Sequence, residues 1–172
     1  MSIFLPDYDF KRIHLIPTEF FTERGLRVLL LDVDNTLTRD NSQEVSDEVV
    51  HWLEDQKKAG LELFVISNNH EARVKPFAEK LGLGYIADAG KPKTKHLKAR
   101  MQELHVTEKE TALIGDQLFT DIACGNLGGC TTILVEPFEL EHYGGYRIKR
   151  PLERPFLRHY FKKKAKLERS GR

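Results

Sequence analysis

Three aspartates stand where their carboxylates could act together on one substrate. Asp32 and Asp34 follow the apolar run that ends at Leu31, and Asp116 follows the run that ends at Gly115. Carboxylates crowded beyond buried strands repel one another unless a cation or separate chemical roles relieve the repulsion. Oxygen ligands of this kind suit a hard cation such as Mg²⁺, which binds one or two carboxylates together with phosphate oxygens. These aspartates therefore predict a magnesium-dependent site.

A hydroxyl and an ammonium group supply the contacts that a phosphoryl group needs. Ser67 ends another apolar run, and its hydroxyl can donate a hydrogen bond to a phosphoryl oxygen. Asn68 follows Ser67 and is also predicted to bind the phosphoryl group. Lys91 follows a short apolar run and can offset the negative charge that develops on the phosphoryl group. With the carboxylates, these residues indicate phosphoryl transfer to an aspartate, assisted by one metal ion and one lysine.

The elements that must position these residues form a regular alternation. Five apolar runs are typical of buried parallel strands, and helical signals separate them. The expected strands are residues 27–32, 61–66, 85–87, 111–115 and 131–135. This alternation predicts a three-layer α/β sandwich, in which helices cover both faces of a five-stranded parallel sheet. In such sheets the functional site lies beyond the carboxyl ends of the strands, where these polar residues fall.

Capping chemistry sets the expected bounds of three helices. Ser46 can cap a helix that runs to about residue 58, with Trp52 on its packed face. Asn69 can cap a second helix, which ends before Gly82. Pro92 fits the first turn of a third helix, which runs to about residue 104.

The polar clusters resemble, in order, the motifs of the haloacid-dehalogenase superfamily. DVDNTL at residues 32–37 matches the Asp-x-Asp-x-Thr motif, and LFVIS matches the apolar strand that ends in a hydroxyl residue. AGKP carries the lysine, and GDQLFTD at residues 115–121 matches GDxxxxD. LPDYDF, VISNN followed by RV, and TILVEP further resemble the YqeG family of phosphatases in subclass IIIA, which is related to the mitochondrial phosphatidylglycerophosphatases.

This resemblance implies a HAD-like Rossmannoid fold and a role for each motif aspartate. Asp32 would attack phosphorus and become an aspartyl-phosphate. Asp34 would protonate the leaving oxygen and then deprotonate the water that hydrolyses the intermediate. Mg²⁺ would be held by the Asp32 carboxylate, the Asp34 backbone carbonyl and Asp116.

The remaining motif residues would support that chemistry. Ser67, Asn68 and Lys91 would hold the phosphoryl group. Asp121 would orient Lys91 or a metal-bound water, and the motif threonine Thr36 would support the site from behind the directly reacting groups.

The spacing between motifs predicts the kind of substrate. The gaps from Asp34 to Ser67 and from Ser67 to Lys91 leave no room for an inserted cap domain. An open site suits a phosphate on a large or surface-bound molecule. The resemblance favours phosphatidylglycerophosphate, with phosphatidylglycerol as product, and the runner-up is a phosphorylated protein or nucleic acid.

Charge is unevenly distributed along the chain. Residues 147–172 contain eleven Lys and Arg against two Asp and Glu, a net charge of +9. The remaining residues contain sixteen against twenty-four, a net charge of −8. An acidic body with a basic tail predicts an anionic partner for the tail.

The basic tail is expected to form an amphipathic helix from Pro155. Its apolar face could pack on the protein's own core, on a second subunit of a homo-oligomer, or in a membrane interface. Its cations could instead bind RNA. These destinations stay open from the sequence.

The remaining features indicate a single cytoplasmic domain. Residues 1–172 are expected to form one domain, with a core of about residues 26–136 and the basic tail at 147–172. No run is long enough to cross a bilayer, and the N-terminal residues lack the pattern of a signal peptide. Cys124 and Cys130 are expected to be reduced and buried. We expect a cytoplasmic protein, which the tail could hold at the inner membrane surface.

Two alternatives belong to other functional classes. A phospho-acceptor receiver domain also clusters aspartates and a lysine, but Asp88 is the sole candidate for its phosphorylated residue. A non-catalytic RNA- or ribosome-associated module on the same fold is the other alternative, since fold alone does not specify function.

Overall fold

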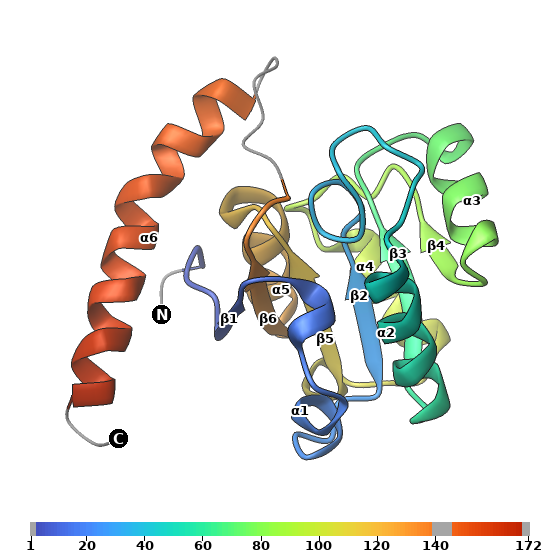
Figure 1. Cartoon of the computed structure of the whole chain (residues 1–172), viewed down its shortest axis with the longest axis horizontal. Coiled ribbons are helices and arrows are strands. Elements are labelled where there is room, and N and C mark those ends of the chain that lie inside the picture. The colour runs from blue at the N-terminus through green and yellow to red at the C-terminus, as the bar shows by residue number, and fades with distance from the viewer. Residues whose placement is uncertain (1–2, 139–145, 170–172) are drawn as a thin grey trace.

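The computed structural model describes residues 3–138 and 146–169 (Figure 1). These residues form one parallel sheet of six strands in the order β1-β6-β5-β2-β3-β4. The strands are β1 (Tyr8–Phe10), β2 (Val28–Leu31), β3 (Glu62–Ile66), β4 (Gly84–Ile86), β5 (Thr111–Gly115) and β6 (Thr131–Val135). Strands β2, β5 and β6 are buried along almost their whole length, as central parallel strands are.

Strand β1 corrects the predicted strand count from five to six. It pairs with β6, so that Tyr8 lies opposite Ile133 and Phe10 lies opposite Val135. The strand has three residues, and Asp9 stands between two aromatic residues, so it lacks the apolar run that marks the other strands. The sheet therefore extends beyond the predicted core of residues 26–136, while the α/β class is confirmed.

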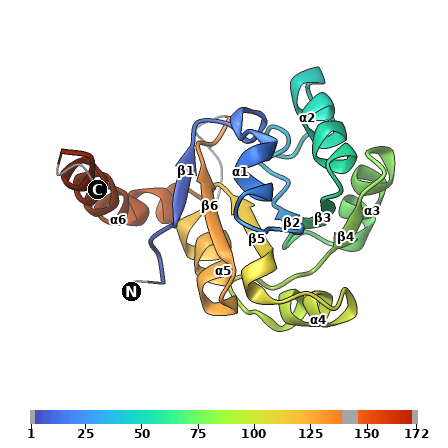
Figure 2. The same cartoon turned by 90° about the horizontal axis from the view of Figure 1, so that it is seen from below.

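Helices cover both faces of the sheet, as Figure 2 shows. One face carries α1, α2 and α3, and the other face carries α4 and α5. Shorter helical turns connect some of these elements. The bounds are η1 (Ile13–Leu15), α1 (Thr18–Thr22), α2 (Asp47–Lys58), α3 (Glu71–Lys80), α4 (Lys95–Glu103), η2 (Glu108–Glu110), the π turn η3 (Leu118–Ile122) and α5 (Ala123–Gly128).

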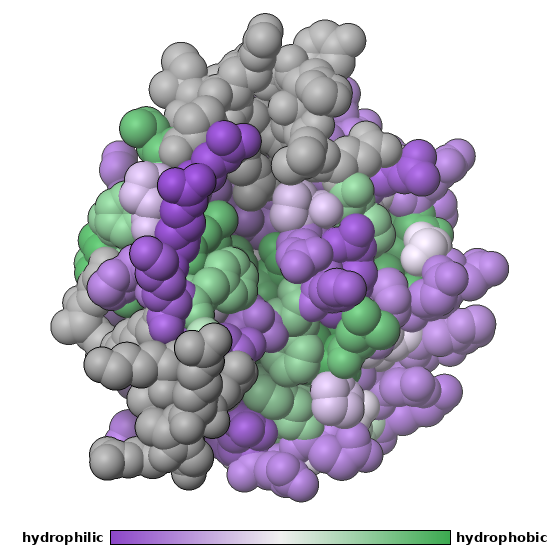
Figure 3. Space-filling view, turned by 60° about the vertical axis from the view of Figure 1, so that its left-hand side comes forward, coloured by the Kyte–Doolittle hydropathy of each residue, from purple (hydrophilic) through white to green (hydrophobic). Residues whose placement is uncertain are grey.

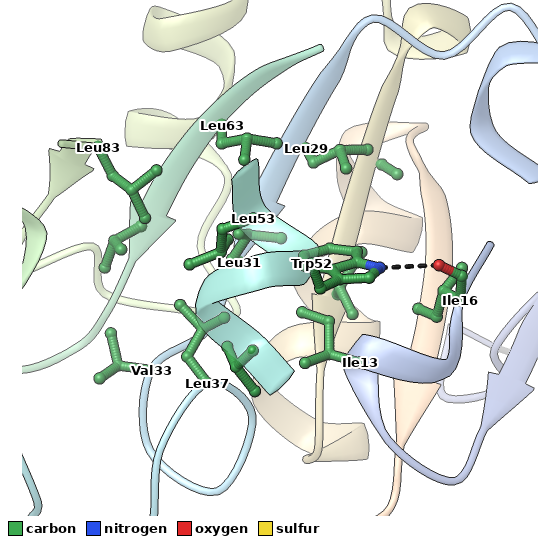
Figure 4. Packing of buried hydrophobic residues seen from close by; sticks show 14 of the residues in the cluster. Ile13, Ile16, Leu29, Leu31, Val33, Leu37, Trp52, Leu53, Leu63 and Leu83 are labelled. Atoms are coloured by element: carbon green, nitrogen blue, oxygen red, sulfur yellow. Dashed lines mark hydrogen bonds between the residues drawn. The ribbon is translucent and has the colours of Figure 1, made fainter. Parts of the chain in front are cut away.

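Trp52 anchors the first of these faces, and its predicted place on the packed side of a helix is confirmed (Figure 4). Its indole is buried against Phe21 at a centroid distance of 6.1 Å. The indole Nε1 donates a hydrogen bond of 2.7 Å to the carbonyl of Ile16. A buried polar group satisfied in this way costs little, so the large ring contributes its full apolar area to the core.

Two of the three helix starts predicted from capping chemistry are wrong. Helix α3 begins at Glu71 with His70 at its N-cap position, because the Asn69 side chain is engaged elsewhere. Helix α4 begins at Lys95, because Pro92 lies in a turn that the hydrogen bond from Lys93 N to Gly90 O closes.

Helix α6 (Tyr146–Arg169) begins earlier than predicted and places Pro155 in its interior. A proline inside a helix removes a backbone hydrogen bond, so packing must compensate. The compensating contacts come from the next residues, since Phe156 and Leu157 pack against Leu118, Ile122 and Leu134. Within residues 3–138 and 146–169, no helix has both the length and the apolar composition that crossing a membrane requires.

Chain connections between the motif residues are short, as predicted for an enzyme without a cap. A loop, α2 and β3 occupy the segment from Asp34 to Ser67. Helix α3 and β4 occupy the segment from Ser67 to Lys91. The carboxyl ends of the strands are therefore left open by these two segments.

Candidate active site

The motif residues meet beyond the carboxyl ends of β2, β3, β4 and β5, which are neighbours in the sheet. One surface hollow is lined by five of the predicted site residues, Asp32, Asp34, Ser67, Asn68 and Lys91, together with Asn69, Gln117 and Thr120. The hollow is mostly polar, and its floor is formed by buried side chains. Residues that are far apart in the chain are thus brought together as the strand register requires.

Lys91 forms the floor of this hollow and is bound by two carboxylates. Its Nζ lies 2.5 Å from Asp32 Oδ1 and 2.6 Å from Asp121 Oδ1. The same nitrogen donates a hydrogen bond of 2.9 Å to the carbonyl of Ile66. The lysine side chain is only 3% exposed, so these three acceptors fix the ammonium in one position.

Burial and charge act in opposite directions on this ion pair. Burial and the charge of Asp121 together raise the pKa of the Asp32 carboxyl to about 7, although Lys91 opposes both effects. Burial alone would lower the pKa of the Lys91 ammonium, but the charges of Asp121 and Asp32 outweigh it and raise that pKa. Lys91 therefore stays protonated, and Asp32 is the group whose charge depends on what else is bound.

Three buried carboxylates could hold a metal ion. Oxygens of Asp32, Asp116 and Asp121 all lie within 4.8 Å of one another. The buried, all-oxygen character of this set fits Mg²⁺. Asp121 already uses both oxygens, because Oδ1 contacts Lys91 and Oδ2 accepts a hydrogen bond from Gln117 N. Asp32 and Asp116 are therefore the better placed side chains.

The Asp34 carboxylate is not part of this three-carboxylate cluster, and it is bound by groups that the sequence did not predict. Asn69 Nδ2 donates to Asp34 Oδ2 at 2.7 Å. Arg73 Nη2 and the backbone N–H of Asn41 bind Asp34 Oδ1 at 2.5 Å and 2.9 Å. A second nitrogen of Arg73 donates to the Asn41 side chain, which closes the arrangement. We call Asn41, Asn69 and Arg73 the Asp34 clamp.

Ser67 and Asn68 differ in what they can offer a phosphoryl group. Ser67 is buried and its Oγ accepts a hydrogen bond of 3.1 Å from Asn69 N, which leaves the hydroxyl proton available for donation. The Asn68 amide binds the Lys91 backbone twice, because Oδ1 accepts from Lys91 N at 2.7 Å and Nδ2 donates to Lys91 O at 3.0 Å. The Asn68 side chain therefore positions the lysine backbone while it also lines the hollow.

Thr36 lies in the tight loop that follows the two motif aspartates. Asn35 has a φ of 61°, a left-handed conformation that asparagine tolerates better than most residues. Thr36 is buried, and its Oγ1 finds no hydrogen-bond partner among the described residues. The role of this hydroxyl in supporting the directly reacting groups stays a prediction.

Gly115 provides the space that Asp121 occupies. A Cβ added at Gly115 would lie 2.4 Å from Asp121 Cγ, far below any normal contact. The glycine of the GDxxxxD motif is required because the fourth-motif carboxylate passes directly over it on its way to Lys91. The π turn η3 delivers that carboxylate back toward the end of β5.

We expect Gly115→Ala to lower both stability and activity. The clash should cost about 1 to 3 kcal/mol of unfolding free energy, and displacement of Asp121 should lower kcat about 10- to 100-fold. Denaturant unfolding and hydrolysis of p-nitrophenyl phosphate measure the two effects. Gly125→Ala is the matched control, because its Cβ would meet Thr132 at 2.5 Å, away from the site. Equal activity of the two variants would contradict the role given to Asp121.

Comparisons with known proteins agree with this geometry. A family model described as mitochondrial PGP phosphatase matches residues 1–81, and an HAD-hydrolase-like model matches residues 88–137. The probable phosphatase YqeG of Bacillus subtilis is 36% identical over 156 residues, which are 91% of this chain and 91% of that protein. The chain belongs to the YqeG family of haloacid-dehalogenase-superfamily phosphatases.

Other relatives of this YqeG-family phosphatase are more distant. A chloroplastic and mitochondrial phosphatidylglycerophosphate phosphatase of Arabidopsis thaliana is 26% identical, over 94% of this chain but 49% of the plant protein. A cobalt-bound deoxy-D-mannose-octulosonate 8-phosphate phosphatase from Haemophilus influenzae has a TM-score of 0.54 at 16% identity, over 65% of this chain and 69% of that chain. A 4-nitrophenylphosphatase from Thermotoga maritima has a TM-score of 0.53 at 14% identity, over 69% and 89%. The two structures show that the fold is shared.

Family membership also decides against the receiver-domain alternative. Asp88, which would have to be phosphorylated in a receiver, does not line the hollow. Its Oδ1 lies 2.7 Å from Nδ1 of the exposed His70 instead. The clustered aspartates Asp32 and Asp116 directly follow β2 and β5 instead.

Proposed function

We propose that the protein is a Mg²⁺-dependent phosphomonoesterase that works through an aspartyl-phosphate on Asp32. The observation that carries this proposal is the Lys91 ammonium, which is buried between Asp32 and Asp121 at the floor of an open polar hollow. A cation fixed beside a carboxylate can attract the phosphoryl oxygens toward that carboxylate and offset their charge during transfer.

In the first step, an Asp32 oxygen forms a bond to phosphorus while the bond from phosphorus to the leaving oxygen breaks. The leaving oxygen takes a proton from Asp34, and the phosphoryl group stays on Asp32. Ser67 donates its hydroxyl proton to a phosphoryl oxygen, and Lys91 balances the added charge. Mg²⁺, held by Asp32, Asp116 and the Asp34 backbone carbonyl, would neutralise the carboxylates and polarise the phosphoryl group.

In the second step, Asp34 removes a proton from water, whose oxygen then attacks phosphorus and releases Asp32 as a carboxylate. The Asp34 clamp supports this half of the reaction, because its hydrogen bonds hold the Asp34 side chain in one orientation. The donors of the clamp must partly release Asp34 when it carries the proton for the first step. Asp121 acts in both steps through Lys91, whose ammonium it keeps charged and in place.

The substrate that we propose is phosphatidylglycerophosphate. The relative from Arabidopsis and the family model over residues 1–81 carry that activity in their names, and this supports the choice for the present chain. An open site without a cap suits a head group presented at a membrane. We propose a single-domain protein that acts from the cytoplasm, held peripherally at the inner membrane surface by the basic tail at 147–172. RNA binding by the tail and homo-oligomer formation are the competing proposals.

A substrate panel tests this assignment. We expect kcat/KM for phosphatidylglycerophosphate in mixed micelles to exceed that for sugar phosphates, mononucleotides and phosphopeptides by roughly 100-fold, because binding of the leaving group is used in the transition state. Preference for a phosphopeptide or an oligonucleotide would instead favour the runner-up. A clear preference for a small sugar phosphate would refute the lipid substrate. No turnover of any phosphomonoester would favour the non-catalytic module.

A further inference from the structure

An apolar groove lies between helix α6 and the edge of the sheet that carries β6 and β1. It encloses about 500 Å³ of space free of protein atoms, including the part open to solvent. Most of the surface that lines it is apolar. The side chains that matter for the argument are Phe10 from β1, Leu134 and Val135 from β6, and Leu157 and Phe161 from α6. Figure 3 looks onto this side of the molecule, where hydrophobic and strongly hydrophilic residues lie next to each other.

Specific contacts hold α6 at this distance from the sheet. Near its start, Glu153 is buried and its Oε1 accepts a hydrogen bond of 2.8 Å from Leu118 N. About two and three turns later, Tyr160 and Lys164 bind the same oxygen of Asp9, at 2.7 Å and 2.6 Å. Between these points the ring of Phe156 packs edge-on against Phe4 and Phe119. Because these contacts fix α6 against the rest of the protein, the groove is a defined feature of the folded structure.

Asp116 joins the groove to the candidate active site, because it lines the groove and a carboxylate oxygen of it lies within 4.8 Å of oxygens of Asp32 and Asp121. Glu153, Leu157 and Phe161 line the groove from α6, and we call the part beside Phe161 its outer end. Glu153 and Phe161 are eight residues apart on the helix, a rise of about 12 Å. A molecule whose phosphoryl group sits on Asp32 beside Asp116 could thus extend along α6 without leaving the protein surface.

Among the described residues, the groove itself is lined by carboxylates and no cation, but cations on the exposed surface of α6 beside it favour an anionic, apolar molecule. Phe161 is 46% exposed and Leu152 is 57% exposed, although both are large apolar side chains. Arg154, Arg158 and Lys162 are exposed on the same helix, and with Phe161 they line a second, shallow hollow on its outer side. Aromatic and aliphatic side chains interleaved with cations are typical of surfaces that bind anionic lipids.

We propose that this groove binds the leaving group of a glycerophospholipid substrate, with its acyl chains emerging past Phe161. The inference rests on the proposed lipid phosphatase function and adds the part of the molecule that recognises the lipid. It explains why an enzyme without a cap needs no other lid, because α6 supplies one wall of the substrate site. It also assigns α6 two roles, since its inner side packs on the protein and its outer rim meets the membrane.

Phe161→Asp tests the outer end of the groove. We expect the ratio of kcat/KM for long-chain phosphatidylglycerophosphate to that for p-nitrophenyl phosphate to fall roughly tenfold or more, mainly through KM, because a carboxylate there repels the lipid and removes apolar contact. Phe161→Leu should restore most of the ratio. Leu127→Asp is the matched control, because Leu127 is 48% exposed on α5 and does not line the groove, so its ratio should equal that of the parent.

Binding without hydrolysis separates this inference from the proposed function. Dihexanoyl phosphatidylglycerol has no phosphomonoester, and calorimetry should show that it binds the parent and binds Phe161→Asp roughly tenfold more weakly. If the parent hydrolyses phosphatidylglycerophosphate but neither measurement responds to Phe161→Asp, the groove inference is wrong and the function stands. If lipid binding depends on Phe161 but no lipid phosphate is hydrolysed, the function is wrong and the groove stands. If the parent binds no lipid, and Phe161→Asp converts a dimer into monomers, the groove is a subunit interface and the inference is overturned.

Discussion

Replacing Asp32 by asparagine should abolish turnover while the protein stays folded. The variant keeps the shape of the side chain but removes the nucleophilic oxygen, so kcat should fall on the order of 10⁴-fold or more. Hydrolysis of p-nitrophenyl phosphate by protein free of contaminating phosphatases measures the loss. Asp88→Asn is the matched control, because Asp88 also follows a strand, but its carboxylate lies beside the exposed His70 and does not line the hollow. More than a few per cent residual activity in Asp32→Asn would refute the assigned mechanism.

The same variant should be more stable than the parent when both are free of metal. The pKa of the Asp32 carboxyl is about 7 in the folded protein, against 3.8 in the unfolded chain. The free energy of unfolding of the parent should therefore fall as pH rises from about 4 through 7. Asp32→Asn lacks that loss, and its unfolding free energy at pH 8 should exceed that of the parent by about 1 to 3 kcal/mol. Urea unfolding at pH 4 and pH 8 measures this difference in unfolding free energy, which should be small at the lower pH. Added Mg²⁺ should narrow it by stabilising the parent alone.

Removal of metal should lower activity almost as strongly as Asp32→Asn does. EDTA treatment should lower kcat on the order of 10³-fold or more, and Mg²⁺ should restore the parent, because the bound cation offsets several clustered carboxylates. Asp116→Ala should stay inactive after Mg²⁺ is added back, since it lacks one of the two best placed ligands. Ca²⁺ should substitute poorly, because it prefers higher coordination and looser geometry. Full activity of the metal-stripped parent in EDTA would rule out the scheme.

Much of the fold could be predicted because its signals are local. Strands β2, β5 and β6 are apolar runs bounded by polar residues, and α2 begins where Ser46 stands, so periodicity and capping identify them. The positions of Asp32, Ser67, Lys91 and Asp116 at strand ends then place them together through the parallel topology alone. Strand β1 escaped prediction because three residues around Asp9 depend on β6 for their conformation.

The Asp34 clamp could not be predicted because it depends on side-chain direction. Asn69 has the chemistry of a helix cap, and the competing use of its amide for Asp34 follows only from the loop geometry. Arg73 comes from the first turn of α3 and is separated from Asp34 by 39 residues in the chain. The burial of Glu153 did have a signal in the sequence, because Glu153 is one of only two acidic residues among the last 26, in a strongly basic segment.

The pairing of β1 with β6 has a consequence for the order in which the chain can fold during synthesis. Backbone and side-chain contacts join Asp7 to Thr132, which are 125 residues apart, so the first strand made is completed by the last one. At ribosomal rates of about 5 to 20 residues per second, residues 8–10 wait roughly 6 to 25 s for their partner strand. The central strands β2 to β5 can pair during that interval, but the edge of β6 is covered, and α6 is docked through Asp9, only when nearly the whole chain has left the ribosome. A nascent chain stalled before residue 131 should therefore expose its N-terminal segment to proteases, while a chain released after α6 should protect it.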